Sequence, residues 1–475
     1  MSSALDTSGS VSSAASDATG AEWGIAPVPE AERGLRAFDL AVLWGDLGIG
    51  LLVLVTGALL VPGLGFFAAL GAILLGSLIG SGLLAFAGAA GARHGIPTMV
   101  LFRPVLGIRG SWVPSALNAL QLIGWTAVEL WAMSYVANIV SREVFGLDAR
   151  WLWLGCAAVV CTALSLWGPV GVTRVWLERF GAWIIAGICL VVTVLIVTAS
   201  GIGDSLFKAG DGSMTFGPGL DLVIAMPVSW LPLVADYNRF GRRPRGAFGG
   251  TFAGYLIANM WLYTLGVLLV LGASADASPA GIAAGILSLF GGSIAGGLFL
   301  VGLLVGETDE AFADIYSCSV SIKNVVESVP QRALVLAVAV VGTALAAALD
   351  MERYEFFLLL IGSVFVPLFG VFIADHFVAR RGGLDVSSLY RRGGPYWYTG
   401  GYRISTVVPW LAGFALYHWV APTGPEWWLE LVARVTPAAP PSWLSAAGAS
   451  IPSFLCSFLL TGALVLAGRG KPESS

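Results

Sequence analysis

Charged residues are scarce in this 475-residue chain, because Asp, Glu, Lys and Arg together make up only 11% of it. A soluble globular protein carries about a quarter charged residues. Hydrophobic residues reach 57%, and the chain holds 62 glycines and 18 tryptophans. Gly is frequent in membrane helices, and Trp gathers at membrane interfaces. The low charge therefore excludes an ordinary soluble domain and indicates a polytopic membrane protein.

Motifs of soluble enzymes are also missing. The five cysteines are scattered and form no CxxC pair, so neither a zinc site nor a disulfide framework is indicated. The three histidines are far apart, and no HExxH, GxSxG or phosphate-binding Walker motif is present. We therefore expect no enzyme, no ATP-driven pump and no cofactor. The net charge of −4 argues against a nucleic-acid partner, and no obligate protein partner is evident.

Twelve apolar stretches approach the length of about 20 residues that a helix needs to cross a bilayer. They cover residues 38–61, 66–90, 112–141, 152–168, 180–200, 219–236, 247–272, 294–323, 331–349, 354–378, 404–420 and 450–467. The predicted fold class is therefore an all-α polytopic membrane protein with twelve transmembrane helices. The stretch 421–449 contains Trp427 and Trp428 and is expected to be an interfacial loop.

The basic residues are distributed unevenly over the segments that join these spans. If the N-terminus is cytoplasmic, 20 of the 25 Lys and Arg residues fall in cytoplasmic segments. Cytoplasmic loops are enriched in these residues. We therefore expect a multi-pass protein of the cell (inner or plasma) membrane with both termini in the cytoplasm. Residues 1–37 are expected to form a disordered tail, and residues 468–475 a short second tail.

Two predicted spans are broken by residues that disfavour helix. The first contains WGDLGIGLLVLVTG at 44–57, where glycines surround Asp46, and the sixth contains AMPVSWLPLVADYNRFGR at 225–242, with two prolines. Each would be the first helix of a five-helix half. Paired interruptions of this kind point to a transporter site, because free backbone groups are tolerated at membrane depth only where they line a cavity. The alternative is that the interruptions are ordinary packing kinks.

The third span places polar residues on one helix face. Gln121, Trp125 and Glu129 follow each other at intervals of four residues. An amide that donates and accepts, next to a flat indole, suits a planar heterocycle. The alternative is that Trp125 is packing and Gln121 bonds a neighbouring helix. Glu129 lies nearer the outer end and is given no role.

The eighth span contains VGETDEAFADIYSCSVS at 305–321, with the acids Glu307, Asp309, Glu310 and Asp314. Acids within a membrane span are rare and usually bind cations or carry protons. The alternative is that this stretch is a loop and the helix begins near residue 311. At the end of the sixth span, Asp236 is expected to form an ion pair with Arg239.

Four stretches carry a resemblance to a known family. They are Trp44 to Gly57, NALQLIGWTAV at 118–128, IAMPVSWLPLVADYNRFG at 224–241 and DIYSCSVS at 314–321. The chain resembles the nucleobase:cation symporter-1 family of cytosine, purine, uracil, allantoin and hydantoin carriers, and within it the hydroxymethylpyrimidine and cytosine permeases. The likeness runs from about residue 38 to residue 380, and YEFFLLLIGSVFVPLFGVFIADHF at 354–377 also looks like a helix of the family.

The resemblance implies a fold of two inverted five-helix repeats with discontinuous helices 1 and 6, as in LeuT-like transporters. The repeats would cover 38–200 and 219–378, followed by two peripheral helices in 404–467. The implied substrate-binding residues lie on helices 3, 6 and 8, and the implied cation-binding residues on helices 1 and 8. The first set is Gln121, Trp125, Ser229, Trp230 and Asp314; the second is Gly45, Asp46, Gly48, Asp309 and Glu310.

The acids on helices 1 and 8 depart from the family pattern. Many relatives have Ser, Thr or Asn one turn before Asp314, where this chain has Asp309 and Glu310, and Asp46 is an additional acid. The coupling ion is therefore Na⁺ or H⁺, and the extra acids favour H⁺ or a cation site with more negative charge.

The expected function is cation-coupled import of a pyrimidine-type base, first hydroxymethylpyrimidine and second cytosine. A purine, uracil, allantoin or hydantoin carrier of the same family is an alternative, and so is a carrier of another small solute. A channel or a membrane-embedded enzyme is not suggested by two broken helices around one small polar cluster.

Overall fold

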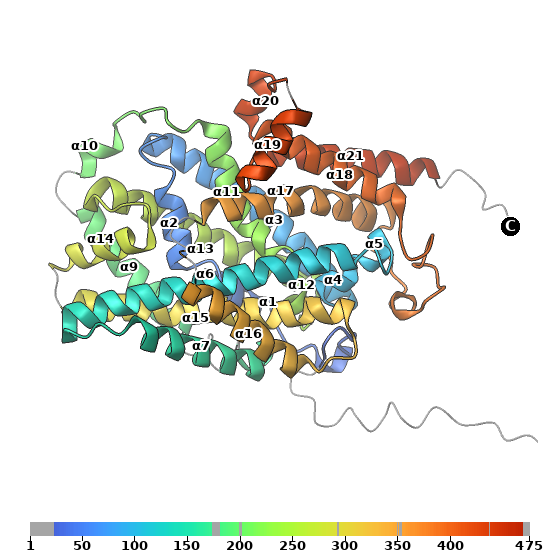
Figure 1. Ribbon diagram of the computed structural model, residues 1–475, viewed down its shortest axis with the longest axis horizontal. Helices are drawn as coiled ribbons and strands as arrows, with labels where there is room; N and C mark the ends of the chain where they lie inside the picture. The colour runs from blue at the N-terminus through green and yellow to red at the C-terminus, as the bar shows by residue number, and fades with distance from the viewer. Residues whose placement is uncertain are drawn as a thin grey trace, which may run out of the picture.

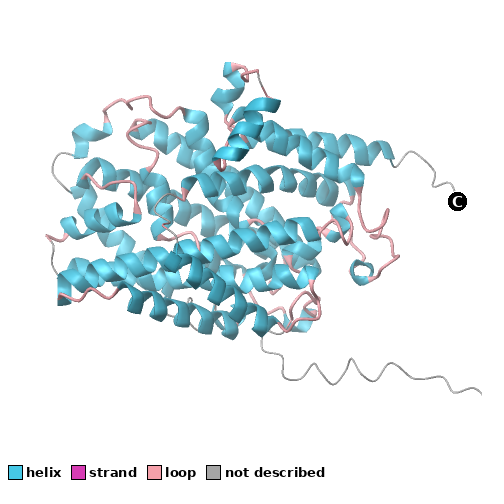
Figure 2. Ribbon diagram, in the orientation of Figure 1, coloured by secondary structure: helices cyan, strands magenta, loops and turns pink. Residues whose placement is uncertain are grey.

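The computed structural model describes residues 23–172, 181–198, 202–291, 294–348, 350, 354–436 and 438–468, and this part of the chain forms a bundle of helices without a β-strand (Figures 1 and 2). The all-α prediction is confirmed. Long helices such as α6 (Trp112–Phe145) and α15 (Ile294–Val325) lie side by side along the long axis of the molecule (Figure 1).

The remaining helices follow in chain order. The first half of the chain forms α1 (Ala37–Asp46), α2 (Leu51–Ala58), α3 (Phe66–His94), α4 (Thr98–Leu101), α5 (Arg103–Leu106), α7 (Arg150–Trp167), α8 (Pro169–Gly171), α9 (Ala182–Thr198) and α10 (Ile202–Leu206). The second half forms α11 (Phe216–Trp230), α12 (Val234–Asn238), α13 (Pro244–Ala273), α14 (Pro279–Leu289), α16 (Gln331–Ala348), α17 (Glu355–Ile373), η4 (Ala374–Ala379), η5 (Ser387–Tyr390), α18 (Ile404–Val420), α19 (Glu426–Val435), α20 (Ser442–Ala447) and α21 (Ser450–Gly468).

A helix or a pair of helices occupies each of the twelve predicted spans. By length and hydropathy, five helices of the described chain could cross a membrane alone, and the bent pair α1–α2 makes a sixth. Helices α6 and α15 are longer still, with 34 and 32 residues, but both carry acidic side chains in their interior. The prediction of a loop at 421–449 is wrong in detail, because this segment contains the helices α19 and α20. Helix α14 was not predicted.

Residues 23–36 are ordered and pack against the bundle, which corrects the prediction of a disordered tail for this part of the chain. Val28 and Leu35 are buried, and the Leu35 N–H donates to the Phe240 carbonyl. The buried Arg239 guanidinium donates to the Gly24 carbonyl at 2.6 Å and to the Tyr316 hydroxyl at 2.9 Å. Gly24 also lies against the Lys323 side chain of α15, so the segment contacts both the end of α12 and α15. Residues 1–22 lie outside the described part of the chain.

The first predicted break is present between α1 and α2, which are bent by 61° relative to each other. Gly50 precedes α2 with an extended backbone, and short-range turns within residues 45–49 replace the regular helix. The second break separates α11 from α12 at residues 231–233. Both discontinuities therefore lie in the helices where the glycines and prolines predicted them.

Helix α13 packs along both halves of the broken first helix through glycines. A Cβ added at Gly250 or Gly254 would overlap a carbonyl oxygen of α1, and one added at Gly266 would overlap the Leu54 carbonyl oxygen of α2. Small residues allow membrane helices to approach until their backbones touch. The angle between α1 and α2 is therefore fixed by a continuous neighbour.

Replacing Gly250 with Val is expected to lower the melting temperature of the detergent-purified protein clearly, because overpacking a close contact costs about 1–3 kcal/mol or more. Gly249→Val is the matched control, since a Cβ at the adjacent Gly249 meets nothing within 4 Å. Equal melting temperatures for the two variants would contradict the close packing of α13 on α1.

Candidate functional site

A small cavity lies where the two broken helices meet α6 and α15. Its volume is about 10 Å³, which is the room that a single water molecule needs. The lining residues come from α2, α6, α11 and α15: Leu52, Trp125, Glu129, Met226, Ser229, Trp230, Glu310 and Asp314. A planar ring would fit only after side chains such as the two indoles move apart.

Aromatic rings form the apolar walls of this cavity. Trp125 is 5% exposed, and its ring contacts Tyr354 edge-on with centroids 5.9 Å apart. Trp230 contacts Trp44 edge-on at 6.1 Å, and the Trp44 indole N–H donates to the Asn238 side-chain oxygen at 2.7 Å. Each wall is thus held by a second aromatic layer, which orients the indole faces.

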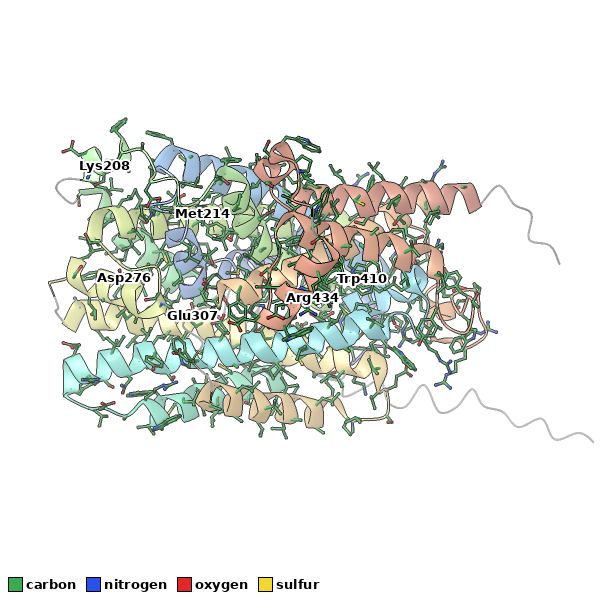
Figure 3. The ribbon with its side chains drawn as sticks, turned by 45° about the horizontal axis from the view of Figure 1, so that its top comes forward. Lys208, Met214, Asp276, Glu307, Trp410 and Arg434 are labelled. Carbon is green, nitrogen blue, oxygen red and sulfur yellow. The ribbon has the colours of Figure 1, made fainter. Side chains whose placement is uncertain are left out.

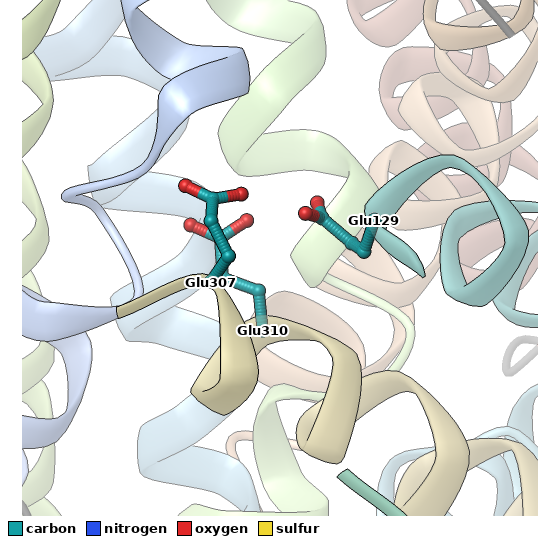
Figure 4. A group of neighbouring side chains, drawn as sticks. All are labelled: Glu129, Glu307 and Glu310. Carbon is teal, nitrogen blue, oxygen red and sulfur yellow. The ribbon is translucent and has the colours of Figure 1, made fainter. Parts of the chain in front are cut away.

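Three carboxylates meet beside the cavity. Glu129 of α6 and Glu307 and Glu310 of α15 lie next to one another (Figure 4), and each offers an oxygen within 4.8 Å of the others. All three are buried, and Figure 3 shows Glu307 among the packed helices. Two unit charges 4 Å apart repel by about 4 kcal/mol at an effective dielectric constant of about 20. This group therefore needs protons, a cation or N–H donors as partners.

The break before α2 accommodates these acids. The backbone N–H of Leu51, at the first turn of α2, donates to the Glu307 carboxylate. The first N–H groups of a helix have no partner within the helix, and this end carries partial positive charge. A Cβ at Gly50 would overlap a carboxylate oxygen of Glu310, so a side chain at this position would displace the Glu310 carboxyl group. The break between α1 and α2 thus leaves a backbone N–H group free to donate a hydrogen bond to Glu307.

A second pair of acids lies at the end of α1. Asp46 is buried, and its carboxyl group is within hydrogen-bonding reach of Asp309 on α15. Asp46 also lines a cavity of about 370 Å³ between α1, α9 and α13, whose other members include Gly45, Ile49 and Trp261. Gly48 packs against Ala258 of α13. Of the predicted cation-binding residues on the first helix, Asp46 is therefore near α15, whereas Gly45 and Gly48 lie against α13, and none of the three lines the small cavity.

Gln121 lies against the break between α11 and α12 and does not line the cavity. Its amide N–H groups donate to the Ser229 carbonyl at 3.2 Å and to the Asn118 side-chain oxygen at 2.6 Å. Asn118 in turn donates to the Pro232 carbonyl at 3.3 Å. Two backbone carbonyls freed by the break are thus satisfied by amides of α6.

Five of the ten site residues predicted from the sequence line the small cavity. They are Trp125, Ser229, Trp230, Asp314 and Glu310.

The alternative that the acidic stretch is a loop is wrong, because α15 is helical throughout it. The predicted Asp236–Arg239 ion pair is not formed, since the Asp236 carboxylate accepts from the Thr98 N–H at 3.0 Å and Arg239 donates to the Asp236 carbonyl.

The sequence reasoning gave no role to Glu129 and did not single out Leu52 or Met226. Glu129 was detectable, because it lies one helical turn after Trp125 on the same face. Leu52 and Met226 are apolar residues in apolar spans, so nothing in the pattern separates them from ordinary packing.

Similarity to known proteins shows the family of this chain. A family model described as permease for cytosine/purines, uracil, thiamine and allantoin matches residues 27–444. The chain belongs to this permease family. It is 27% identical over 361 residues to the cytosine permease of Escherichia coli O157:H7, which covers 75% of this chain and 81% of that relative.

Further relatives differ in the substrates that their names give. The permease is 25% identical over 414 residues to the allantoin permease of Bacillus subtilis strain 168, across 80% of this chain and 83% of that relative. Its fold matches Mhp1, a nucleobase-cation-symport-1 family transporter in a closed conformation with bromovinylhydantoin bound, with a TM-score of 0.80, 19% identity and coverage of 95% and 97%. The predicted family and the LeuT-like fold are confirmed, and the permease is a multi-pass transporter, not an enzyme.

Replacing Gln121 with Leu is expected to lower the melting temperature, because an unpaired buried carbonyl costs about 1–3 kcal/mol. The matched control is Thr126→Val on the same helix, whose hydroxyl bonds only the Leu122 carbonyl one turn away. Thermal unfolding and ligand binding are measured together. Lost binding with an unchanged melting temperature would make Gln121 a direct ligand instead of a support for the break.

Proposed function

We propose that this permease uses a cation gradient to import a pyrimidine-type nucleobase. Hydroxymethylpyrimidine is the first candidate substrate and cytosine the second. The supporting observation is the cavity between the two broken helices, which combines the rings of Trp125 and Trp230 with the carboxyl groups of Glu129, Glu310 and Asp314. Indole faces stack on flat heterocycles, and the polar groups at the rim bond the ring edge.

Other ring substrates are the main alternative. Relatives named for allantoin and hydantoin align over most of the chain, at 25% and 24% identity. A carrier of amino acids or of another small solute would require a helix N-terminus open to a substrate carboxylate. Here the N–H of Leu51 at the start of α2 already donates to Glu307. This contact and the two tryptophans favour a heterocycle.

The coupling cation is assigned to the junction of α1 and α15. Asp46 and Asp309 lie within hydrogen-bonding reach there, with Gly45 and Gly48 at the end of α1 and Glu310 one residue further along α15. Two facing carboxyl groups hold a proton between them or share a small cation. We propose that H⁺ is the coupling ion, because buried acids within a membrane span can take up and release a proton.

Transport would follow from movement of one group of helices, formed by α1–α2, α3, α11–α12 and α13, against a second group, formed by α6, α7, α15 and α16. In the structure, the first group is joined by the contact of α13 with α1 and α2 and by the packing of α11 on α3. The cavity lies between the two groups. Rotation of one group about the cavity would open it to one side of the membrane at a time.

Trp125→Leu is expected to weaken substrate binding by about 10-fold or more, because base–aromatic stacking is worth about 1–3 kcal/mol per base. Equilibrium binding of hydroxymethylpyrimidine and cytosine to the purified protein measures this effect. The matched control is Trp131→Leu, since Trp131 is also buried on α6 but does not line the cavity. Equal affinities in the two variants would remove Trp125 from the site.

Asp46→Asn is expected to abolish stimulation of uptake by the coupling gradient while leaving equilibrium substrate binding within about threefold, since Asp46 lies outside the cavity. Uptake into proteoliposomes is measured with a pH gradient alone and with a Na⁺ gradient alone. Wild-type uptake is expected to follow the pH gradient. A strict requirement for Na⁺ with no response to pH would overturn proton coupling.

A further inference from the structure

A second cavity, which we call the basic cavity, lies between the ordered N-terminal segment, the last turn of α3 and the start of α13. Its volume is about 500 Å³, enough for a polar group of several atoms. Its charged lining residues are Glu30, Arg33, Arg93 and Arg242. None of the residues that line it also lines the small cavity between the broken helices, so the two are separate sites.

Positive charge dominates the lining of the basic cavity. Three guanidinium groups, from Arg33, Arg93 and Arg242, face one carboxyl group, that of Glu30. None of the ion pairs between described residues includes any of these three arginines. Like charges that converge from three separate segments repel each other. The cavity is therefore suited to an anion that would bridge them.

The backbone holds one of the arginines in place. The Arg33 side chain is half-buried, and it donates through Nε to the Val28 carbonyl at 2.9 Å and through Nη1 to the Ala92 carbonyl at 3.3 Å. Both acceptors are neutral, so they orient the guanidinium plane without cancelling its charge. Arg93 and Arg242 are exposed, and neither side chain hydrogen-bonds within the described chain. Both can turn toward a ligand.

The start of α13 adds to the positive potential of the basic cavity. Pro244 is the first residue of this 30-residue helix, and it lines the cavity. The first N–H groups of a helix have no partner within it and carry partial positive charge. A ligand anion in the cavity would thus face guanidinium groups and a helix N-terminus together. Phosphate groups are bound in this way, and Arg in particular pairs with two of their oxygens at once.

An apolar surface continues from the basic cavity along the same two helices. Phe86 precedes Arg93 by seven residues, about two turns, so both lie on one face of α3. Phe86 is 43% exposed, and its ring contacts that of Phe248, one turn after Pro244 on α13, with centroids 5.0 Å apart. Helices α3 and α13 are each long and apolar enough to cross a membrane. The arginines therefore lie where two spans end, and the phenylalanines lie within the spans.

We propose that the basic cavity binds the phosphate group of an anionic phospholipid whose acyl chains lie along Phe86 and Phe248. A soluble phosphate compound carries the same group, but it would leave the apolar surface uncovered. The distribution of Lys and Arg predicts that this end of the bundle is cytoplasmic. Basic pockets between helices on that side bind anionic headgroups. The inference does not depend on the transported substrate or on the coupling ion.

Native mass spectrometry of the full-length purified permease measures lipid binding directly. The protein is titrated with dioleoylphosphatidylglycerol, which has a net negative charge, and with dioleoylphosphatidylcholine, which has the same acyl chains and a phosphate but no net charge. Wild type is expected to bind the first phosphatidylglycerol molecule about 10-fold more tightly than phosphatidylcholine, because the headgroup charge is not cancelled within the lipid.

The double variant Arg93→Gln, Arg242→Gln is expected to bind phosphatidylglycerol about 10- to 30-fold more weakly, since each Arg beside an anionic headgroup contributes about fivefold. Both side chains are exposed, so the melting temperature without lipid is expected to stay unchanged. The matched control is Arg391→Gln, Arg392→Gln, an exposed pair at the same predicted cytoplasmic end that does not line the cavity. Its affinity for phosphatidylglycerol is expected to remain within about threefold of wild type.

The variant Glu30→Gln gives a prediction of opposite sign. Glu30 supplies the carboxyl group that lines the basic cavity, and a phosphate there would be repelled by it. Removing this charge is expected to tighten phosphatidylglycerol binding by about three- to fivefold. A gain in affinity cannot result from a loss of folded protein, so this variant tests the site independently of stability.

Titration with inorganic phosphate in lipid-free detergent separates the two sources of the phosphate group. A preference for phosphatidylglycerol that falls only in the cavity variant and rises in Glu30→Gln would support the lipid site. Equal binding of the two lipids, or an equal loss in the cavity variant and its control, would overturn it. If inorganic phosphate alone raises the melting temperature of wild type but not of the cavity variant, and the lipids bind equally, the ligand is a soluble phosphate compound and the lipid assignment is overturned.

Discussion

Backbone groups that lose their helical partners deep in the bundle are the constraint on which this structure depends. No water is available in the hydrocarbon core, so each such group must bond a side chain or face an enclosed site. The break before α2 directs the Leu51 N–H to Glu307, and the break after α11 directs the carbonyls of Ser229 and Pro232 to amides of α6. The positions of the two breaks therefore determine where α6 and α15 carry polar side chains.

The same constraint brings the small cavity and the proposed cation site close together. Glu310 lines the small cavity and also belongs to the group formed with Glu129 and Glu307. Asp309, the adjacent residue of α15, reaches Asp46 at the end of α1. One helical turn thus connects the substrate cavity with the proposed cation site.

The sequence predicts the fold well because its signals are local. Apolar runs, glycines around Asp46 and prolines near Ser229 specify helices and breaks without knowledge of the partner helix. The site is only partly predictable, because the face that a residue presents depends on how helices pack. Gln121 and Glu129 lie on the same face of α6, yet Gln121 meets the α11–α12 break and Glu129 meets the cavity.

Partner choice also explains where sequence reasoning failed. Arg239 and Asp236 are close in sequence, but Arg239 bonds the carbonyl of Gly24 and Asp236 bonds the N–H of Thr98. Residues 23–36 are ordered because they contact residues that are far away in the sequence. The polar composition of the N-terminal region gave no indication of these contacts. Long-range contacts of this kind become visible only in three dimensions.

The glycine contacts of α13 have a mechanical consequence. A helix of 30 residues is about 45 Å long, and α13 holds α1 near one end and α2 near the other. Although the first helix is interrupted, its two halves are attached to one unbroken rod. If that rod tilts about its middle, α1 and α2 move in opposite directions relative to α6 and α15. Opening at one end of the molecule would then close the other end by geometry alone, as with the two arms of a lever.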